Sequence, residues 1–331
     1  MRPASPTAST IDPREYLEFR GPQDLAARLR RQTGYCIQAP ALAALVESLE
    51  SSTALLAEGK PGCGKSALAD ALSEAFNLPH FNLQSMEGLT LADILYSWDV
   101  AAQASAKPET RWTREHLLLG EVLAAFDHAA RLGVCLLQID EVDKLSERNQ
   151  HMLLQLLQSG FADVPRLEPT SAVGITDGRA RWPIVVLTSN DSGEIISDPL
   201  RSRCSYTWIQ SPTPSEEVEI LRARCPVAGF ELIRSVVRLK AVIERSGDLR
   251  QKPGLREFIR LTKRLAEKGI SELTPEIIAS HACHLVKRRT DQASFLAAAT
   301  RLAYVARVAN RTIDGIVEEA FGVGRAEEEA A

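Results

Sequence analysis

The stretch Gly59-Lys60-Pro61-Gly62-Cys63-Gly64-Lys65-Ser66 decides the fold of this chain. It fits the pattern GxxxxGK(S/T), in which a glycine-rich loop turns its backbone N–H groups toward phosphates at the N-terminus of a helix. The apolar run from Thr53 to Ala57 before it predicts a buried strand. The spacing of apolar residues after it predicts a helix from Lys65 to Phe76. The loop therefore stands in the strand–loop–helix context that phosphate binding requires.

Each part of this loop has an expected task. We expect Lys65 to reach the β- and γ-phosphates of a nucleotide and the hydroxyl of Ser66 to bind Mg²⁺. The residues expected to contact the nucleotide are Gly59, Lys60, Pro61, Gly62, Cys63, Gly64, Lys65, Ser66 and Ala67.

Strand-like and helix-like segments alternate on both sides of this loop. Further strands are expected at Phe81–Gln84, Val134–Ile139, Ile184–Ser189 and Tyr206–Ile209, and helices at 23–50, 91–106, 114–131 and 147–159. Gly34 and Pro40 break the first helical pattern. This alternation predicts an α/β domain with a mostly parallel sheet over residues 23–210.

The pattern changes after Ser211, where only helical segments remain. They are expected at 214–224, 230–246, 254–268, 275–288 and 292–321. We therefore expect a small helical lid over 211–290 and a C-terminal helix with an acidic tail over 291–331. Residues 1–22 are expected to be a flexible N-terminal segment.

Two carboxylates follow the apolar run Val134–Ile139. Asp140, at the carboxyl end of the expected strand, is placed to hold the hydration shell of Mg²⁺. Glu141 is placed to polarise a water molecule for attack on the γ-phosphate. An acidic pair after a strand is by itself more often a solvated turn, but here it follows a phosphate-binding loop.

Three further polar side chains lie near the ends of later strands. Asn190 ends the expected strand Ile184–Ser189 and is a candidate for orienting the attacking water, although Asn190-Asp191 also fits a turn. Arg203, with Arg201 as the second candidate, precedes the last strand. A guanidinium supplied to a neighbouring subunit's γ-phosphate would stabilise the charge of the transition state, and two solvated arginines are the alternative.

These motifs, in this order, resemble the MoxR family of AAA+ ATPases, and in particular its CoxD-like branch. The resemblance covers residues 23–290. It includes the segments Phe81–Asp99, Ile139–Lys144, Thr188–Asn190, Leu200–Ile209 and Lys252–Gly254. It implies a P-loop NTPase (AAA+) fold, with a parallel five-stranded sheet sandwiched by helices and followed by a small all-α lid.

The resemblance also implies an assembly and a task. Members form hexameric rings with shared active sites, and they couple ATP hydrolysis with Mg²⁺ to chaperone-like maturation of a client. They work with a von Willebrand factor A domain protein, and CoxD-like members serve molybdenum hydroxylase-type enzymes. The family's two insertions would fall near 86–100 and, as a hairpin, near 161–183. Its sensor-2 arginine would be Arg256, with Arg250 and Lys252 as competitors.

Composition narrows the alternatives. The 331 residues carry 39 Lys+Arg and 43 Asp+Glu, for a net charge of −4, so no overall basic excess points to nucleic acid. The 6 cysteines are scattered and no stretch reaches 18 apolar residues, which predicts reduced thiols in a cytoplasmic protein without a membrane span. Two other functions remain open: a motor or loader acting on nucleic acid, and a nucleotide-gated scaffold in a defence or signalling system.

Overall fold

The computed structural model describes residues 9–178, 181–190, 196–246, 249–308 and 310–322. The chain divides into two compact units, and each is described here by itself. The first is formed mainly by residues up to Ile209 and the second mainly by residues from Gln210 onward. The acidic tail expected at Glu327–Glu329 lies outside the described residues.

A five-stranded sheet forms the centre of the first unit, with strand order β2-β5-β8-β1-β9 and every neighbouring pair parallel. The strands are β1 (Ala54–Gly59), β2 (His80–Gln84), β5 (Leu136–Asp140), β8 (Ile184–Asn190) and β9 (Cys204–Trp208). Their residues are buried and apolar through most of β1, β5 and β8, as expected for parallel strands covered on both faces. The predicted five-stranded parallel sheet is confirmed.

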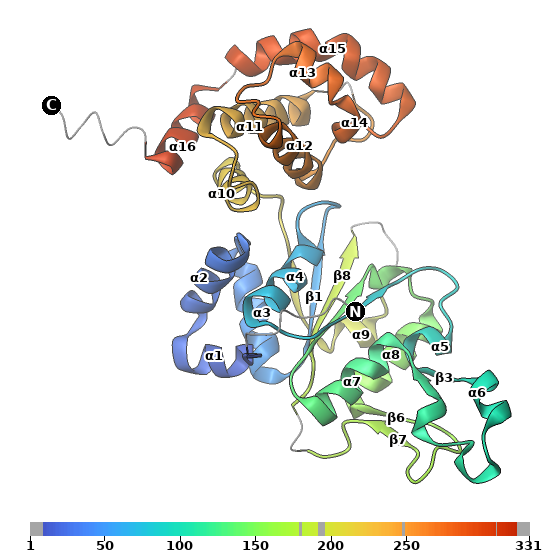
Figure 1. The fold of residues 1–331 in the computed structure, drawn as a ribbon. Coiled ribbons are helices and arrows are strands. Elements are labelled where there is room, and N and C mark those ends of the chain that lie inside the picture. Colours follow the sequence, from blue (N-terminus) through green and yellow to red (C-terminus); the bar gives the residue numbers. More distant parts are fainter. Residues whose placement is uncertain (1–8, 179–180, 191–195, 247–248, 309, 323–331) are drawn as a thin grey trace. The chain divides into compact units, whose positions relative to one another are not determined.

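Different helices cover the two faces of this sheet (Figure 1). On one face, α7 (Glu121–Leu132) and α8 (Glu147–Ser159) share a core with alternate strand residues such as Leu56 and Leu137. On the other face, α3 (Ala39–Ser51) packs along β9 and β1, while α4 (Lys65–Phe76) packs on β5. The predicted helices at Lys65–Phe76 and 147–159 are therefore confirmed.

The segment between β2 and α7 differs from the prediction. The helix expected at 91–106 is interrupted by a strand, and the helix expected at 114–131 begins only at Glu121. The elements are α5 (Leu91–Ile94), β3 (Tyr96–Trp98), α6 (Val100–Ser105), η1 (Pro108–Thr110), η2 (Arg114–His116) and β4 (Leu117–Leu119). Helical spacing did not reveal the break because β3 pairs antiparallel with β4, far along the chain. We call residues 86–119 the first insert.

A hairpin of β6 (Phe161–Asp163) and β7 (Ala172–Gly174) precedes β8, within the range where the family resemblance places one. It docks on the first insert. The guanidinium of Arg166 lies 4.9 Å from the centre of the Trp112 ring, and Glu168 N–H donates to Trp112 O at 3.0 Å. Trp112 in turn meets Trp98 edge to face, with ring centres 5.1 Å apart. The two insertions are thus joined within one unit.

The N-terminal segment also differs from the prediction of a flexible stretch over 1–22. Residues Pro13–Arg20 form helix α1, which Asp12 caps by accepting from Arg14 N–H, and Leu17 is buried. Arg14 donates to the carbonyl of Trp182 at 2.9 Å, so the helix is tied to the chain just before β8. Helix α2 (Pro22–Thr33) follows, and the pattern at 23–50 is two helices, α2 and α3.

The second unit is entirely helical in its described part. Its helices are α10 (Pro214–Arg224), α11 (Phe230–Arg245), α12 (Leu255–Glu267), α13 (Pro275–Ser280), α14 (Ala282–Leu285), α15 (Arg289–Val308) and α16 (Arg311–Phe321). The expected helices at 275–288 and 292–321 are each divided in two. Phe295, Leu302, Ile313 and Val317 share one core with α10 to α14, so the described part of 291–331 belongs to this helical core.

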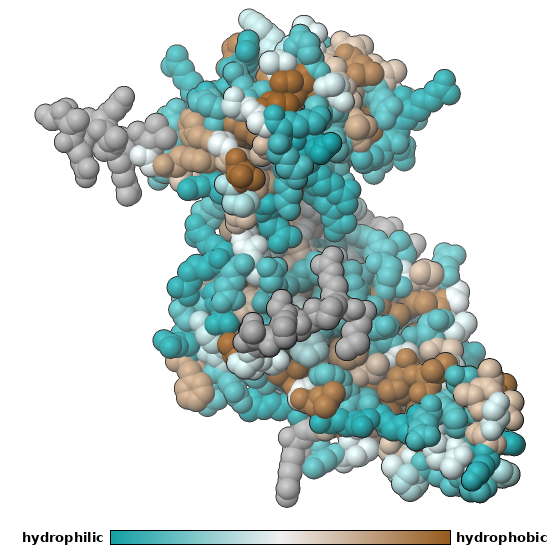
Figure 2. Space-filling view, viewed as in Figure 1, coloured by the Kyte–Doolittle hydropathy of each residue, from teal (hydrophilic) through white to brown (hydrophobic). Residues whose placement is uncertain are grey.

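The described residues also show how polar the surface is, whether a helix could span a membrane, and the state of the cysteines. On the face that Figure 2 shows, hydrophilic residues predominate and hydrophobic ones form smaller groups between them. Within the described ranges, none of the helices combines the length and the apolar character needed to cross a lipid bilayer. All six cysteines are free thiols, and burial raises the pKa of Cys135 and Cys204 to about 12.

Candidate functional site

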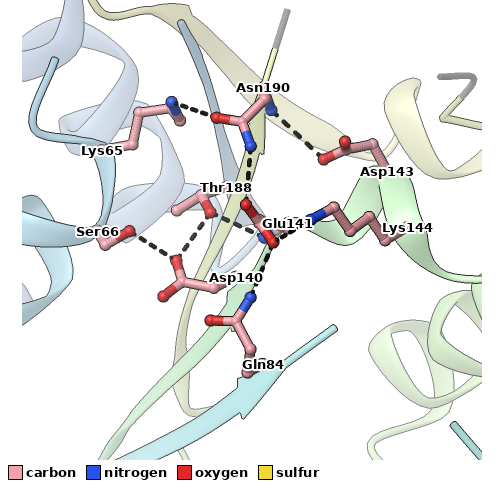
Figure 3. A network of polar contacts seen from close by, with 9 residues as sticks. All are labelled: Lys65, Ser66, Gln84, Asp140, Glu141, Asp143, Lys144, Thr188 and Asn190. Carbon is pink, nitrogen blue, oxygen red and sulfur yellow. Dashed lines mark hydrogen bonds and ion pairs between the residues drawn. The ribbon is translucent and has the colours of Figure 1, made fainter. Parts of the chain in front are cut away.

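Polar side chains from four strand ends meet at one edge of the sheet (Figure 3). In the strand register, Gly59 lies opposite Asn190 and Gln84 lies opposite Asp140. Because all these strands are parallel, their carboxyl ends share this edge. The edge therefore brings together five of the predicted residues: Lys65, Ser66, Asp140, Glu141 and Asn190.

The loop between β1 and α4 supplies the ammonium group. Gly62 and Gly64 have φ of +81° and +106°, a left-handed conformation that glycine adopts without strain. The loop then enters α4 directly at Lys65, whose Nζ donates to Gly59 O at 2.8 Å, Lys60 O at 3.0 Å and Asn190 Oδ1 at 3.0 Å. All three acceptors are neutral, so the buried ammonium is hydrogen-bonded but its charge has no anionic partner among the residues that the structure describes.

Asp140 is likewise a buried charged residue without an oppositely charged partner among the described residues, and its charge is negative. Its Oδ1 accepts from Ser66 Oγ at 2.9 Å and from Thr188 Oγ1 at 2.8 Å, and its Oδ2 accepts from Gln138 Nε2 at 2.7 Å. The residue is only 9% exposed, and these donors from the described part of the chain are all uncharged. A buried carboxylate without a cation is costly, so this arrangement fits a bound cation.

The oxygen donors suit Mg²⁺. A hydroxyl and a carboxylate at hydrogen-bond distance are hard ligands of the kind that Mg²⁺ prefers. Among the described residues no group of three or more His, Cys, Asp or Glu side chains could hold a metal ion. Mg²⁺ commonly takes one or two protein ligands and completes its shell with water and phosphate oxygens.

Glu141 leaves the strand in an unusual backbone conformation, with φ +56°. Its N–H donates to Thr188 Oγ1 at 3.1 Å. Its carboxylate accepts from Asn190 Nδ2 at 3.0 Å on Oε1, and from Gln84 Nε2 at 3.1 Å and Lys144 Nζ at 2.6 Å on Oε2. The carboxylate is thus held from several directions beside Asn190, as a positioned base requires.

The two candidate arginines have different surroundings. Arg201 forms a two-pronged ion pair with Glu58 of β1, at 2.9 and 3.1 Å, and this hydrogen bonding raises the pKa of Arg201 further above its ordinary value. Arg203 is exposed and donates to the neutral carbonyl of Pro199 at 2.9 Å. Arg203 therefore keeps its charge available, whereas that of Arg201 is matched within its own unit.

The sensor-2 candidates belong to the helical unit. Arg256 lies in the first turn of α12, and Lys252 Nζ donates to the carbonyl of Glu244. The assignment of sensor 2 to Arg256, with Arg250 and Lys252 as competitors, stays a prediction.

Several residues at the site were not predicted from the sequence. Thr188, Gln84 and Gln138 each hold one of the two carboxylates, and Lys144 and Asp143 reach back from the turn after Glu141. Thr188 could have been found, because it lies two residues before Asn190 on the same face of a strand. Gln84 could not, because its contact depends on the pairing of β2 with β5.

Residues 54–204 match the AAA domain family of the dynein-related subfamily. A search of curated proteins finds no match to this chain. A mutant of RuvB from Thermotoga maritima is 17% identical, with 85% of this chain and 72% of that chain covered and a TM-score of 0.42.

A second structure from Thermotoga maritima, the RuvB Holliday junction branch migration motor, is 16% identical. The alignment covers 77% of this chain and 67% of that chain, with a TM-score of 0.41. Both TM-scores lie below 0.5, so neither likeness bears on what this chain does. The matched range, residues 54–204, includes every predicted site residue except Arg256.

Proposed function

We propose that this protein is an ATPase that hydrolyses ATP with Mg²⁺ at the carboxyl edge of its sheet. One observation carries the proposal. A buried ammonium on Lys65, a buried carboxylate on Asp140 and the fixed base Glu141 converge there, and neither buried charge has an opposite partner in the described part of the chain. A Mg²⁺–nucleotide complex would supply both missing charges, with phosphate oxygens for Lys65 and the cation for Asp140.

The residues divide the work of binding. The loop from Gly59 to Gly64 and the N-terminus of α4 present backbone N–H groups to the phosphates, and Lys65 would exchange its carbonyl acceptors for phosphate oxygens. Ser66 and Asp140 would hold Mg²⁺, which when bound neutralises charge that develops on the phosphate oxygens.

Glu141 and Asn190 serve the chemical step. Glu141 accepts a proton from the attacking water as its oxygen bonds to the γ-phosphorus, and the bond to the β-phosphate breaks to release ADP and phosphate. Asn190 bonds both Lys65 and Glu141, so it links the phosphate-binding group to the base. Its amide would orient the same water.

The proposal also includes the oligomeric state of the protein and the client on which it acts. Exposed Arg203 would act on the nucleotide of a neighbouring copy in a homo-oligomeric, hexameric ring, and Arg256 would sense the nucleotide from the lid. The resemblance to the MoxR family supports a chaperone-like role, including metal-centre assembly in a molybdenum hydroxylase-type client, together with a von Willebrand factor A domain partner. The joined inserts are the elements we expect to meet that client.

ATP hydrolysis measured against protein concentration tests the proposal. The wild type is compared with Glu141→Gln, and with Glu147→Gln as a matched control at an exposed carboxylate outside the site. We expect specific activity to rise with assembly, and to fall roughly 100-fold or more in Glu141→Gln with ATP binding retained. Equal activity in the wild type and Glu141→Gln would contradict the proposal, and binding without turnover at any concentration would favour a nucleotide-gated scaffold.

A second measurement addresses the output. Turnover is compared without additions, with a co-expressed von Willebrand factor A domain protein, and with DNA at several salt concentrations. Stimulation by the protein partner supports the chaperone-like role. Stimulation by DNA that weakens steeply with salt would favour the motor instead.

A further inference from the structure

We propose that Lys144 is a positioning residue for hydrolysis. Its ammonium group donates a hydrogen bond to Oε2 of Glu141. This leaves Oε1 as the oxygen that takes the proton from water. The inference rests on the proposed function and deepens it, because it assigns different tasks to the two oxygens of the catalytic carboxylate. No part of it depends on the client or on the ring.

The turn that carries Lys144 is rigidly attached to the site. Residues Val142–Lys144 form the 3₁₀ turn η3 directly after Glu141. Val142 is fully buried in the core of the first unit. Lys144 N–H donates to Glu141 O at 2.9 Å and Leu145 N–H to Val142 O at 3.1 Å, which closes the turn. The position of the Lys144 backbone is therefore set by the same strand end that carries the base.

The hydrogen bonds to Glu141 are unequal. Oε2 accepts two donors, Lys144 Nζ at 2.6 Å and Gln84 Nε2 at 3.1 Å, while Oε1 accepts one, Asn190 Nδ2 at 3.0 Å. An ionised carboxylate has about four acceptor sites, two on each oxygen. Among the described residues, the remaining acceptor site is thus on Oε1.

The oxygen with this remaining site is on the side where water must be held. Asn190 bonds Oε1 through Nδ2 and bonds Lys65 through Oδ1, so Oε1 is the carboxylate oxygen connected to the phosphate-binding lysine (Figure 3). A water that donates to the remaining acceptor site of Oε1 would lie beside the Asn190 amide, where we propose that it meets the nucleotide. Lys144 and Gln84 approach through the other oxygen.

The turn also holds the partner of the base. Asp143 Oδ1 accepts from the backbone N–H of Asn190 at 3.4 Å, so adjacent residues of η3 reach both Glu141 and the end of β8. The alternative for Lys144 is an ordinary surface ion pair, since its side chain is 41% exposed and such pairs contribute little to stability. The two interpretations differ in turnover rather than in folding.

The experiment measures ATP turnover for Lys144→Met, Lys144→Arg and Lys144→Gln. Lys107→Met, at an exposed lysine of the first insert, is the matched control. We expect Lys144→Met and Lys144→Gln to lower kcat roughly tenfold with KM for ATP unchanged, because the base is less well oriented while the nucleotide is still bound. Lys144→Arg should restore most of the loss, because a guanidinium can still bond Oε2.

A double variant shows whether Lys144 acts through Glu141. Adding Lys144→Met to Glu141→Gln should cause no further loss of turnover, whereas independent effects would multiply. Wild-type kcat in both Lys144→Met and Lys144→Gln, or a raised KM at unchanged kcat, would overturn this inference and leave the proposed function standing. Absence of turnover in the wild type would overturn the proposed function, and this inference with it.

Discussion

Two buried carboxylates in this molecule have opposite surroundings. Glu217 in α10 is 4% exposed and pairs with Lys240 of α11, which also contacts Glu244. Asp140 at the sheet edge is 9% exposed, and its hydrogen-bond donors in the described chain are neutral. The first charge is balanced within the fold and serves packing. The second has no cationic partner among the described residues, which is why we propose a binding role for it.

The largest expected effect is at the balanced pair. Lys240→Met leaves Glu217 charged and buried without a partner, and we expect a loss of about 3–5 kcal/mol in the free energy of unfolding. Chemical denaturation measures it. The double variant Lys240→Met/Glu217→Leu removes both charges and should recover most of the loss. Equal stability of Lys240→Met and the wild type would show that the pair is not what balances Glu217.

Asp140→Asn makes the contrasting change at the unbalanced carboxylate. We expect turnover to fall roughly 100-fold, about 2.7 kcal/mol in activation free energy, while the unfolding free energy without nucleotide stays within about 1 kcal/mol of wild type. Mg²⁺ with ATP should raise the Tm of the wild type and not of the variant. A Tm that falls sharply without ligand would mean that Asp140 holds the fold rather than the metal.

Arg201 and Arg203 show the same difference between a charge that is paired and one that is unpaired among the described residues, here at partly exposed or exposed positions. Arg203→Ala should lower turnover roughly tenfold or more in assembled protein, with ATP binding by each subunit unchanged, because its charge is available to act in trans. Arg201→Ala should cost at most about 1 kcal/mol of stability, since its ion pair with Glu58 is partly exposed. Mixing Arg203→Ala with Glu141→Gln subunits tests sharing directly, and no recovery of activity in the mixture would count against it.

The last change concerns a hydroxyl that contacts both acidic residues, the carboxylate of Asp140 and the backbone N–H of Glu141. Thr188→Val removes the donor to Asp140 and the acceptor for Glu141 N–H at nearly constant volume. We expect a loss of about 1–2 kcal/mol in unfolding free energy and a several-fold lower kcat. Thr188→Ser keeps the hydroxyl and is the control. A Val variant as active as the Ser variant would show that Asp140 needs no second hydroxyl.

Local patterns predicted the residues whose neighbours lie close in the chain. The loop at Gly59–Ser66, the helix it opens and the strand before Asp140 could be predicted because apolar spacing and glycine positions are local signals. The break in the helix expected at 91–106 could not, because β3 exists only through its pairing with β4. Gln84 was missed as a donor to Glu141 for the same reason, since it reaches Glu141 across a strand pair rather than along the chain.

The roles of individual site residues could be predicted only where the order of the motifs along the chain was informative. Asn190 and Glu141 could be proposed as site residues from the order of the motifs, and the structure shows that they are hydrogen-bonded to each other. The sequence ranked Arg203 ahead of Arg201 by motif order alone, since both precede the same strand. The ion pair of Arg201 with Glu58 distinguishes them, because it depends on where β1 lies beside β9.

The contact between Arg166 and Trp112 has a mechanical consequence. The hairpin and the first insert are separate in sequence, yet a pull on the hairpin tip would reach the insert through contacts that include this cation–π contact, one backbone hydrogen bond and the bridge between Thr113 and Glu168. At an exposed site the cation–π contact contributes about 0.5–1 kcal/mol, much less than a paired strand. Because these contacts join the same two short segments, a load on the hairpin tip would enter the first insert at residues 112–113.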